Sequence, residues 1–137
     1  ILIRNPNFNR PWQHVMEPLY GYLLLAKNLY FKPKKFSGPW NFGTKKNTVT
    51  TVKQIALIMV ELWGKGKIKI NKNKKYYEQE NLQLNISKAI KNLNWKPKYN
   101  IKKSLELTIN WYKNEITKEE TSYKKTISQI IEYSEQD

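Results

Sequence analysis

Arg10-Pro11-Trp12-Gln13-His14-Val15-Met16-Glu17-Pro18-Leu19 is the stretch on which the fold of this chain depends, and Gly21-Tyr22-Leu23 follows closely behind it. It brings an arginine, an indole, an amide, an imidazole and a carboxylate together, and it runs directly into an apolar segment. A guanidinium binds phosphate through two parallel N–H groups, and a neighbouring indole offers a flat face to a base or a sugar. The stretch therefore indicates a helix start next to a site for a phosphorylated ligand.

The rest of the chain alternates helical periodicity with short extended segments. Glu17-Pro18 suits the first turn of a helix that ends before Pro33, and Thr51 with Gln54 predicts a capping box. Further helices are expected after Asn85 or Ser87, after Asn100 and in the last fifteen residues, with Gly64 and Asn94 as left-handed closing residues. Short strands are predicted at 1–4, 40–43 and 68–70, an extended segment at 82–86, and loops at 32–38, 44–50 and 71–77.

Composition favours one packed domain. The chain has 137 residues, five tryptophans, nine tyrosines and no cysteine, which excludes disulfides and thiolate metal sites. No apolar run approaches the roughly 20 residues that span a bilayer, and no signal-peptide pattern opens the chain. The absence of cysteine is compatible with a reducing cytoplasm, the localisation that we expect.

The net charge of +14 raises the alternative of a small nucleic-acid-binding module. The charge is nearly all lysine, however: Arg4 and Arg10 are the only arginines beside 23 lysines, 15 asparagines and 14 isoleucines. A nucleic-acid interface would concentrate arginine with aromatic residues on one face. The lysines are therefore interpreted mainly as solvated surface, and neither a nucleic-acid nor a membrane partner is predicted.

Three motifs, in the same order, resemble the CDP-glucose 4,6-dehydratases of the extended short-chain dehydrogenase superfamily. The first is Asn5-Pro6 followed by Arg10 to Leu19 and Gly21-Tyr22-Leu23. The second is the strand end Trp40-Asn41-Phe42-Gly43. The third is Leu84-Asn85-x-Ser87-Lys88-Ala89-x-x-x-Leu93-Asn94-Trp95-x-Pro97, where Asn85 and Asn94 stand for the family's aspartate and glycine; Trp111-Tyr112 and Gln129-Ile130-x-x-Tyr133 match its closing helices.

The resemblance implies an α+β, helix-rich lobe with a few short strands: the C-terminal, sugar-nucleotide-binding part of such an enzyme at 1–116, with a helical tail at 117–137 packed on it. The parent enzyme would convert CDP-glucose to the 4-keto-6-deoxy sugar nucleotide, for deoxysugars of a bacterial surface polysaccharide, and would be a homodimer. Its NAD and its catalytic tyrosine and lysine would belong to the N-terminal half, so this chain is expected to bind no NAD and no metal.

The residues agree with that expectation. A dinucleotide site needs a glycine-rich turn between a strand and a helix, and the five glycines do not form one. Two strings have the Tyr-x-x-x-Lys spacing of the superfamily's catalytic pair, Tyr30 with Lys34 and Tyr99 with Lys103. Pro33 interrupts the first and the second straddles a helix start, so both are rejected. No catalytic residue is predicted here.

Four residues are predicted to bind substrate: Arg10, Trp12, Glu78 and Asn47. The resemblance implies that Arg10 approaches the diphosphate, although a surface arginine pairing with a carboxylate is the alternative. Trp12 would line the sugar or nucleotide pocket unless it is simply core, and Glu78 would accept a hydrogen bond from a cytosine amine or a ribose hydroxyl. Asn47 lies in the loop where related enzymes place a polar nucleotide contact.

Two further polar residues of the first motif receive structural interpretations. His14, the only histidine, cannot build a metal site alone and is interpreted as a hydrogen-bonded structural group. Glu17 is interpreted as a first-turn charge at the positive end of the helix dipole. Three alternatives to the CDP-glucose enzyme stay open: another sugar-nucleotide dehydratase or epimerase, the nucleic-acid module, and a remnant that binds nothing. One face of the lobe should expose apolar surface that packs on the catalytic half.

Overall fold

The computed structural model describes residues 1–45, 48, 50–71 and 78–136 of the 137-residue chain. Within them helices dominate and strands are only two residues long, so the α+β, helix-rich class is confirmed. The helices are α1 (Met16–Phe31), α2 (Pro33–Phe36), α3 (Val52–Trp63), α4 (Ser87–Leu93), α5 (Ile101–Thr117) and α6 (Ser122–Ser134); the strands are β1 (Leu2–Ile3), β2 (Asn9–Arg10), β3 (Thr50–Thr51) and β4 (Lys69–Ile70).

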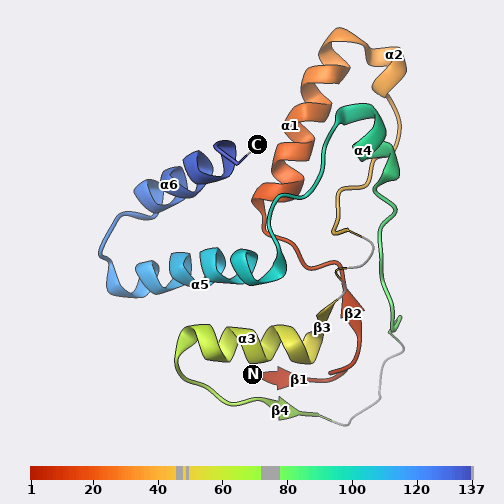
Figure 1. Cartoon of the computed structure of the whole chain (residues 1–137). Helices are drawn as coiled ribbons and strands as arrows, with labels where there is room; N and C mark the ends of the chain where they lie inside the picture. The colour runs from red at the N-terminus through yellow and green to blue at the C-terminus, as the bar shows by residue number, and fades with distance from the viewer. Residues whose placement is uncertain (46–47, 49, 72–77, 137) are drawn as a thin grey trace.

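The elements form two groups joined by the first motif and by α5 (Figure 1). At one end α1 packs with α2 and α4, and at the other end α3 lies between α5 and the strands. β1 pairs with β4 in parallel, whereas β2 pairs with β3 antiparallel, with Arg10 opposite Thr50. The strands thus form two short pairings that hold the N-terminal segment against α3, and they do not build a central sheet.

Local capping signals determine where the helices begin and end. Thr51 and Gln54 form the predicted capping box, and Gly64 closes α3 with a φ of 87°. Asn94 closes α4 with a φ of 52°, and the Asn100 side chain accepts the Lys103 N–H at the start of α5. These features need only neighbouring residues, which is why the sequence predicts them correctly.

The main core lies between α1, α2 and α4. Phe42 and Trp95 meet edge to face with ring centroids 5.0 Å apart, and Trp95 is fully buried. Gly21 of α1 makes this packing possible, because a Cβ there would lie 2.3 Å from the Phe42 ring. The other members of this core are Phe36, Ile86, Ala89 and Leu93, with Tyr20, Leu24, Leu25, Leu29 and Trp40 at its edge.

Glu17 connects three parts of the chain that are distant in sequence. Its side chain is fully buried, and its carboxylate accepts hydrogen bonds from the backbone N–H groups of Lys98 and Tyr99, the latter at 2.7 Å. The Tyr133 hydroxyl of α6 donates to the same carboxylate at 2.7 Å, and the Trp95 indole donates to the Glu17 carbonyl at 3.1 Å. Glu17 lies in the first turn of α1, as predicted. Its burial and its hydrogen bonds to remote segments are a further role that the sequence did not reveal.

Two predicted segments differ from the structure. Residues 40–43 form no strand, because Phe42 turns into the core and the Trp40 indole donates to the Phe36 carbonyl at 2.7 Å instead of joining a ladder. The predicted loop at 32–38 contains the short helix α2, which begins at Pro33. Proline is well suited to that first position, and Phe36 anchors the turn in the core.

We predict that Glu17→Gln lowers the free energy of unfolding by about 3 kcal/mol, because an amide replaces a buried acceptor of charge-assisted hydrogen bonds. Urea unfolding followed by circular dichroism measures the change. Glu61→Gln, at an exposed position of α3, is the matched control and should stay within about 0.5 kcal/mol of the unsubstituted chain. Equal stability of the two variants would show that the Glu17 network does not hold the fold together.

Candidate functional site

A pocket of about 330 Å³ opens between the N-terminal segment and α3. Its volume lies within the range of ligand sites, which is about 300–1,000 Å³. The walls are mostly apolar, and the polar groups Arg4, Asn5, Arg10 and Glu78 lie among its lining residues. The apolar lining comes from β1, from the turn that follows it and from one side of α3: Ile1, Leu2, Ile3, Phe8, Trp12, Val52, Ile55, Ala56 and Met59.

The pocket lies at this place because the turn after β1 is hydrogen-bonded to the first turn of α3. The Val52 N–H donates to the Phe8 carbonyl at 3.0 Å, and the Lys53 N–H donates to the Pro6 carbonyl at 2.9 Å. These two groups belong to the first turn of α3, whose N–H groups have no partner within the helix. The loop thereby fixes the entrance of the pocket relative to its α3 wall.

Arg10 and Glu78, 68 positions apart, form an ion pair in this pocket. Arg10 Nη2 lies 2.9 Å from Glu78 Oε1, and the Asn5 amide donates to the other carboxylate oxygen. Arg10 Nη1 also donates to the Asn9 carbonyl at 2.7 Å and to the Gln79 carbonyl at 2.9 Å. The Arg10 and Asn5 hydrogen bonds lower the pKa of Glu78 below its usual value, so the carboxylate stays ionised and accepts only.

The structure thus brings three of the four predicted binding residues to one pocket. Arg10 pairs with a carboxylate, which was the alternative to the predicted contact with a diphosphate. Trp12 is 36% exposed, so the indole is partly available at the surface and is not a core residue. Asn47 lies outside the described residues. Asn5 completes the cluster. It belongs to the first motif, but the sequence did not predict a binding role for it, because an Asn-Pro step is also typical of turns.

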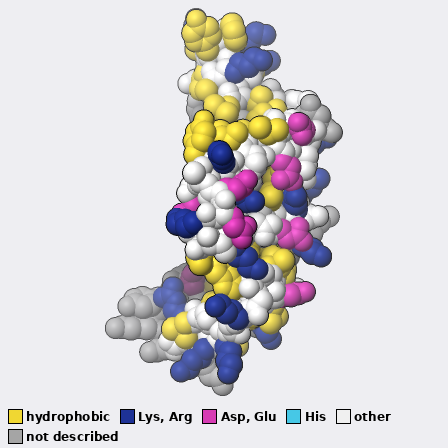
Figure 2. Space-filling view, turned by 90° about the vertical axis from the view of Figure 1, so that its left-hand side faces the viewer, with side chains coloured by type: hydrophobic (Ala, Val, Ile, Leu, Met, Phe, Trp, Pro, Cys, Tyr) yellow, Lys and Arg dark blue, Asp and Glu magenta, His cyan; other side chains and the backbone are white. Residues whose placement is uncertain are grey.

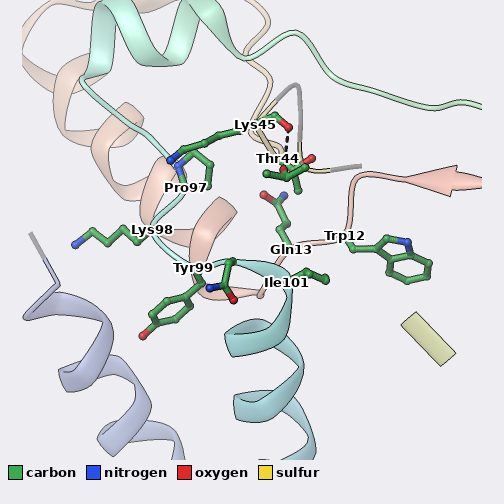
Figure 3. Close-up of a pocket in the computed structure, with 10 residues that line it drawn as sticks. Trp12, Gln13, Thr44, Lys45, Pro97, Lys98, Tyr99 and Ile101 are labelled. Carbon is green, nitrogen blue, oxygen red and sulfur yellow. Dashed lines mark hydrogen bonds between the residues drawn. The ribbon is translucent and has the colours of Figure 1, made fainter. Parts of the chain in front are cut away.

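A second, smaller cavity of about 130 Å³ lies beside Trp12 and Gln13 (Figure 3). Its remaining lining is Thr44, Lys45, Thr48, Pro97, Lys98, Tyr99, Asn100 and Ile101. The Gln13 amide donates to the Phe42 carbonyl at 3.1 Å, which ties the first motif to the loop after α2. The Tyr99 ring points toward α6, where it meets Tyr133 edge to face. Trp12 thus lines both cavities, and Lys98 and Tyr99, whose backbone N–H groups donate to Glu17, line the smaller one.

His14 is structural, as the sequence analysis interpreted it. It is 4% exposed, its Nδ1 accepts the Met16 N–H at 3.3 Å, and its ring lies against Tyr99. Burial lowers the pKa of His14, and the negative charges of Glu17 and Glu132 only partly oppose that shift. The imidazole is therefore kept neutral, with Nδ1 as an acceptor at the start of α1.

The described residues do not fit a dinucleotide or a metal ion. The glycines with positive φ are Gly38, Gly64 and Gly66; Gly64 closes α3, and none lies in a turn between a strand and a following helix. Within the described part of the chain, no three metal-ligating side chains come together, and no helix is both long and apolar enough to cross a membrane.

The fold is a helix-rich lobe, and its pocket combines mostly apolar walls with the polar side chains of Arg4, Asn5, Arg10 and Glu78. Over 114 residues the chain is 40% identical to the CDP-glucose 4,6-dehydratase of Salmonella typhimurium strain LT2, and the aligned region makes up 82% of this chain and 32% of that relative. No family model matches the chain. The chain is thus similar over most of its own length to a CDP-glucose 4,6-dehydratase, in agreement with the resemblance of the three motifs, and it spans about a third of the length of that relative.

We predict that stability falls as the pH is lowered below about 6.5, the usual pKa of histidine. The pKa of His14 is lowered in the folded chain. Below 6.5 the unfolded chain therefore binds a proton that the folded chain does not, and protons favour unfolding. His14→Asn keeps an acceptor for the Met16 N–H but cannot titrate, so its stability should change less between pH 6.5 and 5. Parallel pH profiles for both chains, from urea unfolding, would contradict the prediction.

Proposed function

We propose that this chain is the sugar-nucleotide-binding lobe of a dehydratase that converts CDP-glucose to CDP-4-keto-6-deoxyglucose. The observation that carries the proposal is the pocket in which Arg10, Trp12 and Glu78 meet, within a chain 40% identical to a CDP-glucose 4,6-dehydratase. We further propose, as the resemblance of the three motifs implies, that other parts of the protein hold NAD, that the whole protein is a homodimer, and that it acts in the cytoplasm in deoxysugar synthesis for a surface polysaccharide.

The pocket suits a nucleotide in its shape and in its chemistry. The apolar side of α3 and β1 can take the faces of a pyrimidine, and the Trp12 indole can stack on a ring at the entrance. The ionised Glu78 carboxylate accepts hydrogen bonds from hydroxyl or amine donors of the ligand. Its partner Arg10 supplies the positive charge that an incoming diphosphate requires.

Arg10 serves two roles in this proposal. Its guanidinium pairs with Glu78 and donates to the carbonyl of Gln79, which positions the segment that lines the pocket at Glu78. A diphosphate at the pocket entrance would share the same guanidinium, which carries five N–H donors. Because the nucleotide lies far from the reacting carbons of the sugar, its binding energy would position the sugar without taking part in proton transfer.

NAD would supply hydride-transfer chemistry when it is bound by another part of the protein. The role that we propose for this chain is to hold the substrate in place for that chemistry. Lys and Arg side chains, dark blue in Figure 2, are scattered over the face that it shows. Such a surface could also attract polyanions, and that binding would fall steeply with salt. A nucleotide in the pocket would be less sensitive to salt because apolar contacts contribute to its binding.

We predict that the chain binds CDP-glucose and that Arg10→Ala weakens binding by about tenfold or more, since a buried charge-assisted contact to phosphate is lost. Isothermal titration calorimetry measures the affinity, with dTDP-glucose as the competing sugar nucleotide. Lys35→Ala, which removes a positive charge from exposed α2, controls for net charge and should bind as the unsubstituted chain does. Urea unfolding confirms that each variant is folded.

Three results would contradict this function. Absence of CDP-glucose binding by the folded chain would remove its basis, and equal affinity for dTDP-glucose would favour another sugar-nucleotide enzyme. Binding that Arg10→Ala and Lys35→Ala weaken equally would indicate a general charge effect. Dehydratase activity is measured on the protein isolated from its own cells, by the loss of CDP-glucose and the appearance of a 4-keto sugar.

A further inference from the structure

The last turn of α1 and the short helix α2 form one end of the molecule (Figure 1), and this end exposes two aromatic rings. Tyr30 is 83% and Phe31 is 69% accessible, and the two rings meet edge to face with their centroids 5.1 Å apart. Among the described residues, Tyr30 is the most exposed of the large hydrophobic side chains. Four exposed lysines flank the two rings in the chain: Lys27, Lys32, Lys34 and Lys35. These six residues are called the tip below.

The fold holds the side chains of the tip close to one another. Lys27 precedes Tyr30 and Phe31 by one helical turn, so it lies on the same side of α1. Just beyond the tip, Phe36 is buried in the core, which fixes α2 next to the end of α1. Figure 2 shows hydrophobic side chains, in yellow, together with dark blue Lys side chains at this end, at the top of the view. The tip is therefore a mixed apolar and basic surface.

The charge around the tip has a single sign. No Asp or Glu occurs in residues 18–60 or 81–105. The helices α1, α2 and α4, which pack together, therefore carry one acidic side chain, Glu17, and it is fully buried in the first turn of α1. The ion pairs among the described residues do not include a lysine of the tip. The four ammonium groups are thus available to an anionic partner.

The combination of rings and lysines matters more than either group alone. Lysine is common over this surface, so lysine by itself marks no site. An aromatic ring left in water, however, forgoes the free energy that its burial would contribute. Aromatic side chains collect at the headgroup level of a bilayer, and lysines are attracted to anionic lipids while their alkyl stems lie along apolar surface. The tip has both features in one place.

We propose that the tip is a peripheral contact site for an anionic membrane surface. Tyr30 and Phe31 enter the headgroup layer, and the four lysines contact the lipid phosphates. Shallow insertion of this kind needs no membrane-spanning helix. The sequence led to the opposite expectation, no membrane partner, because it counted the lysines as solvated surface. Helical periodicity does not reveal that both rings beside them are exposed.

A nucleic acid is the other polyanion that lysines attract, and the geometry of the tip favours lipid. The tip contains no arginine. Its two rings lie edge to face, with an angle of 89° between their planes, so they do not form a platform on which successive bases stack. The tip is also the end of a helix and not a groove along which a strand could run. These features suit insertion into a surface.

The proposed contact leaves the sugar-nucleotide pocket open and does not rest on the proposed function. The tip follows the last turn of α1, whereas the pocket is lined by residues that precede α1, such as Trp12. A helix of 16 residues is about 24 Å long. A chain held to a membrane by its tip would therefore still bind CDP-glucose, and each property is tested separately.

Vesicle sedimentation tests the proposal on the full chain. The anionic probe is a vesicle of phosphatidylcholine with about one third phosphatidylglycerol, and pure phosphatidylcholine is the neutral probe. We expect binding to the anionic vesicles, which Tyr30→Ser/Phe31→Ser weakens about tenfold or more because the inserted rings are lost. The matched control is Ile116→Ser/Tyr123→Ser, whose side chains are 70% and 74% exposed on α5 and α6; it should bind as the unsubstituted chain does.

Charge reversal separates a local contact from general attraction. Lys34→Glu/Lys35→Glu should weaken binding to the anionic vesicles about tenfold or more. Lys102→Glu/Lys124→Glu changes the net charge equally at exposed positions of α5 and α6. At physiological ionic strength charges beyond about 8 Å are screened, so this control should weaken binding less than about twofold. Urea unfolding confirms that every variant is folded.

A fluorescent label reports insertion directly, because the chain has no cysteine that would compete for it. A dye sensitive to polarity is attached to Phe31→Cys and, as the control, to Tyr123→Cys. With anionic vesicles its emission should shift to shorter wavelength at position 31 and stay unchanged at position 123. An equal shift at both positions, or none at position 31, would overturn the proposal.

The sedimentation results overturn it in three further ways. They do so if the chain fails to bind anionic vesicles, if the two serine variants lose binding equally, or if the two charge reversals do. Duplex DNA is tested in place of the vesicles. Binding to DNA that Tyr30→Ser/Phe31→Ser abolishes, with no binding to vesicles, would assign the tip to nucleic acid instead.

Discussion

The structure depends on a single buried carboxylate. Glu17 accepts hydrogen bonds from the backbone at Lys98 and Tyr99 and from the hydroxyl of Tyr133, which come from parts of the chain more than 80 residues away. Burying a charge costs free energy unless hydrogen bonds compensate for it. Loss of one donor therefore leaves the carboxylate with too few hydrogen bonds in an apolar interior. The network therefore joins α1, the segment before α5, and α6, and each of the three contributes a group that the buried carboxylate arrangement needs.

This constraint also positions the candidate site. Glu17 belongs to the same short stretch as Arg10 and Trp12. Two residues between them fix its course: Gln13 donates to the Phe42 carbonyl, and His14 is buried against Tyr99. The pocket side of the stretch can then meet Glu78 and Asn5 at a fixed place. The same short stretch thus carries both the buried Glu17 carboxylate and Arg10, one of the polar groups of the pocket.

Local signals allowed much of the fold to be predicted. The capping box of Thr51 and Gln54 and the left-handed Asn94 depend only on residues within one or two helical turns. The structure therefore has them at the predicted positions. The prediction of a strand at 40–43 was wrong. Phe42 is buried in the core and the Trp40 indole donates to the Phe36 carbonyl, and the periodicity of the sequence reveals neither contact. The division into a lobe at 1–116 and a tail at 117–137 stays a prediction, although Tyr133 ties α6 directly to α1.

The sequence by itself determined the family resemblance and the helix-rich class, because motifs, caps and periodicity are local properties of the chain. It also named Arg10, Trp12 and Glu78 as binding candidates, which stay predictions. Only the tertiary structure decided which groups meet. Nothing in the spacing of Arg10 and Glu78 indicates that they form an ion pair, and nothing near Glu17 reveals its distant donors. The physical reason is that burial and hydrogen bonding between remote segments arise only once the whole chain has packed.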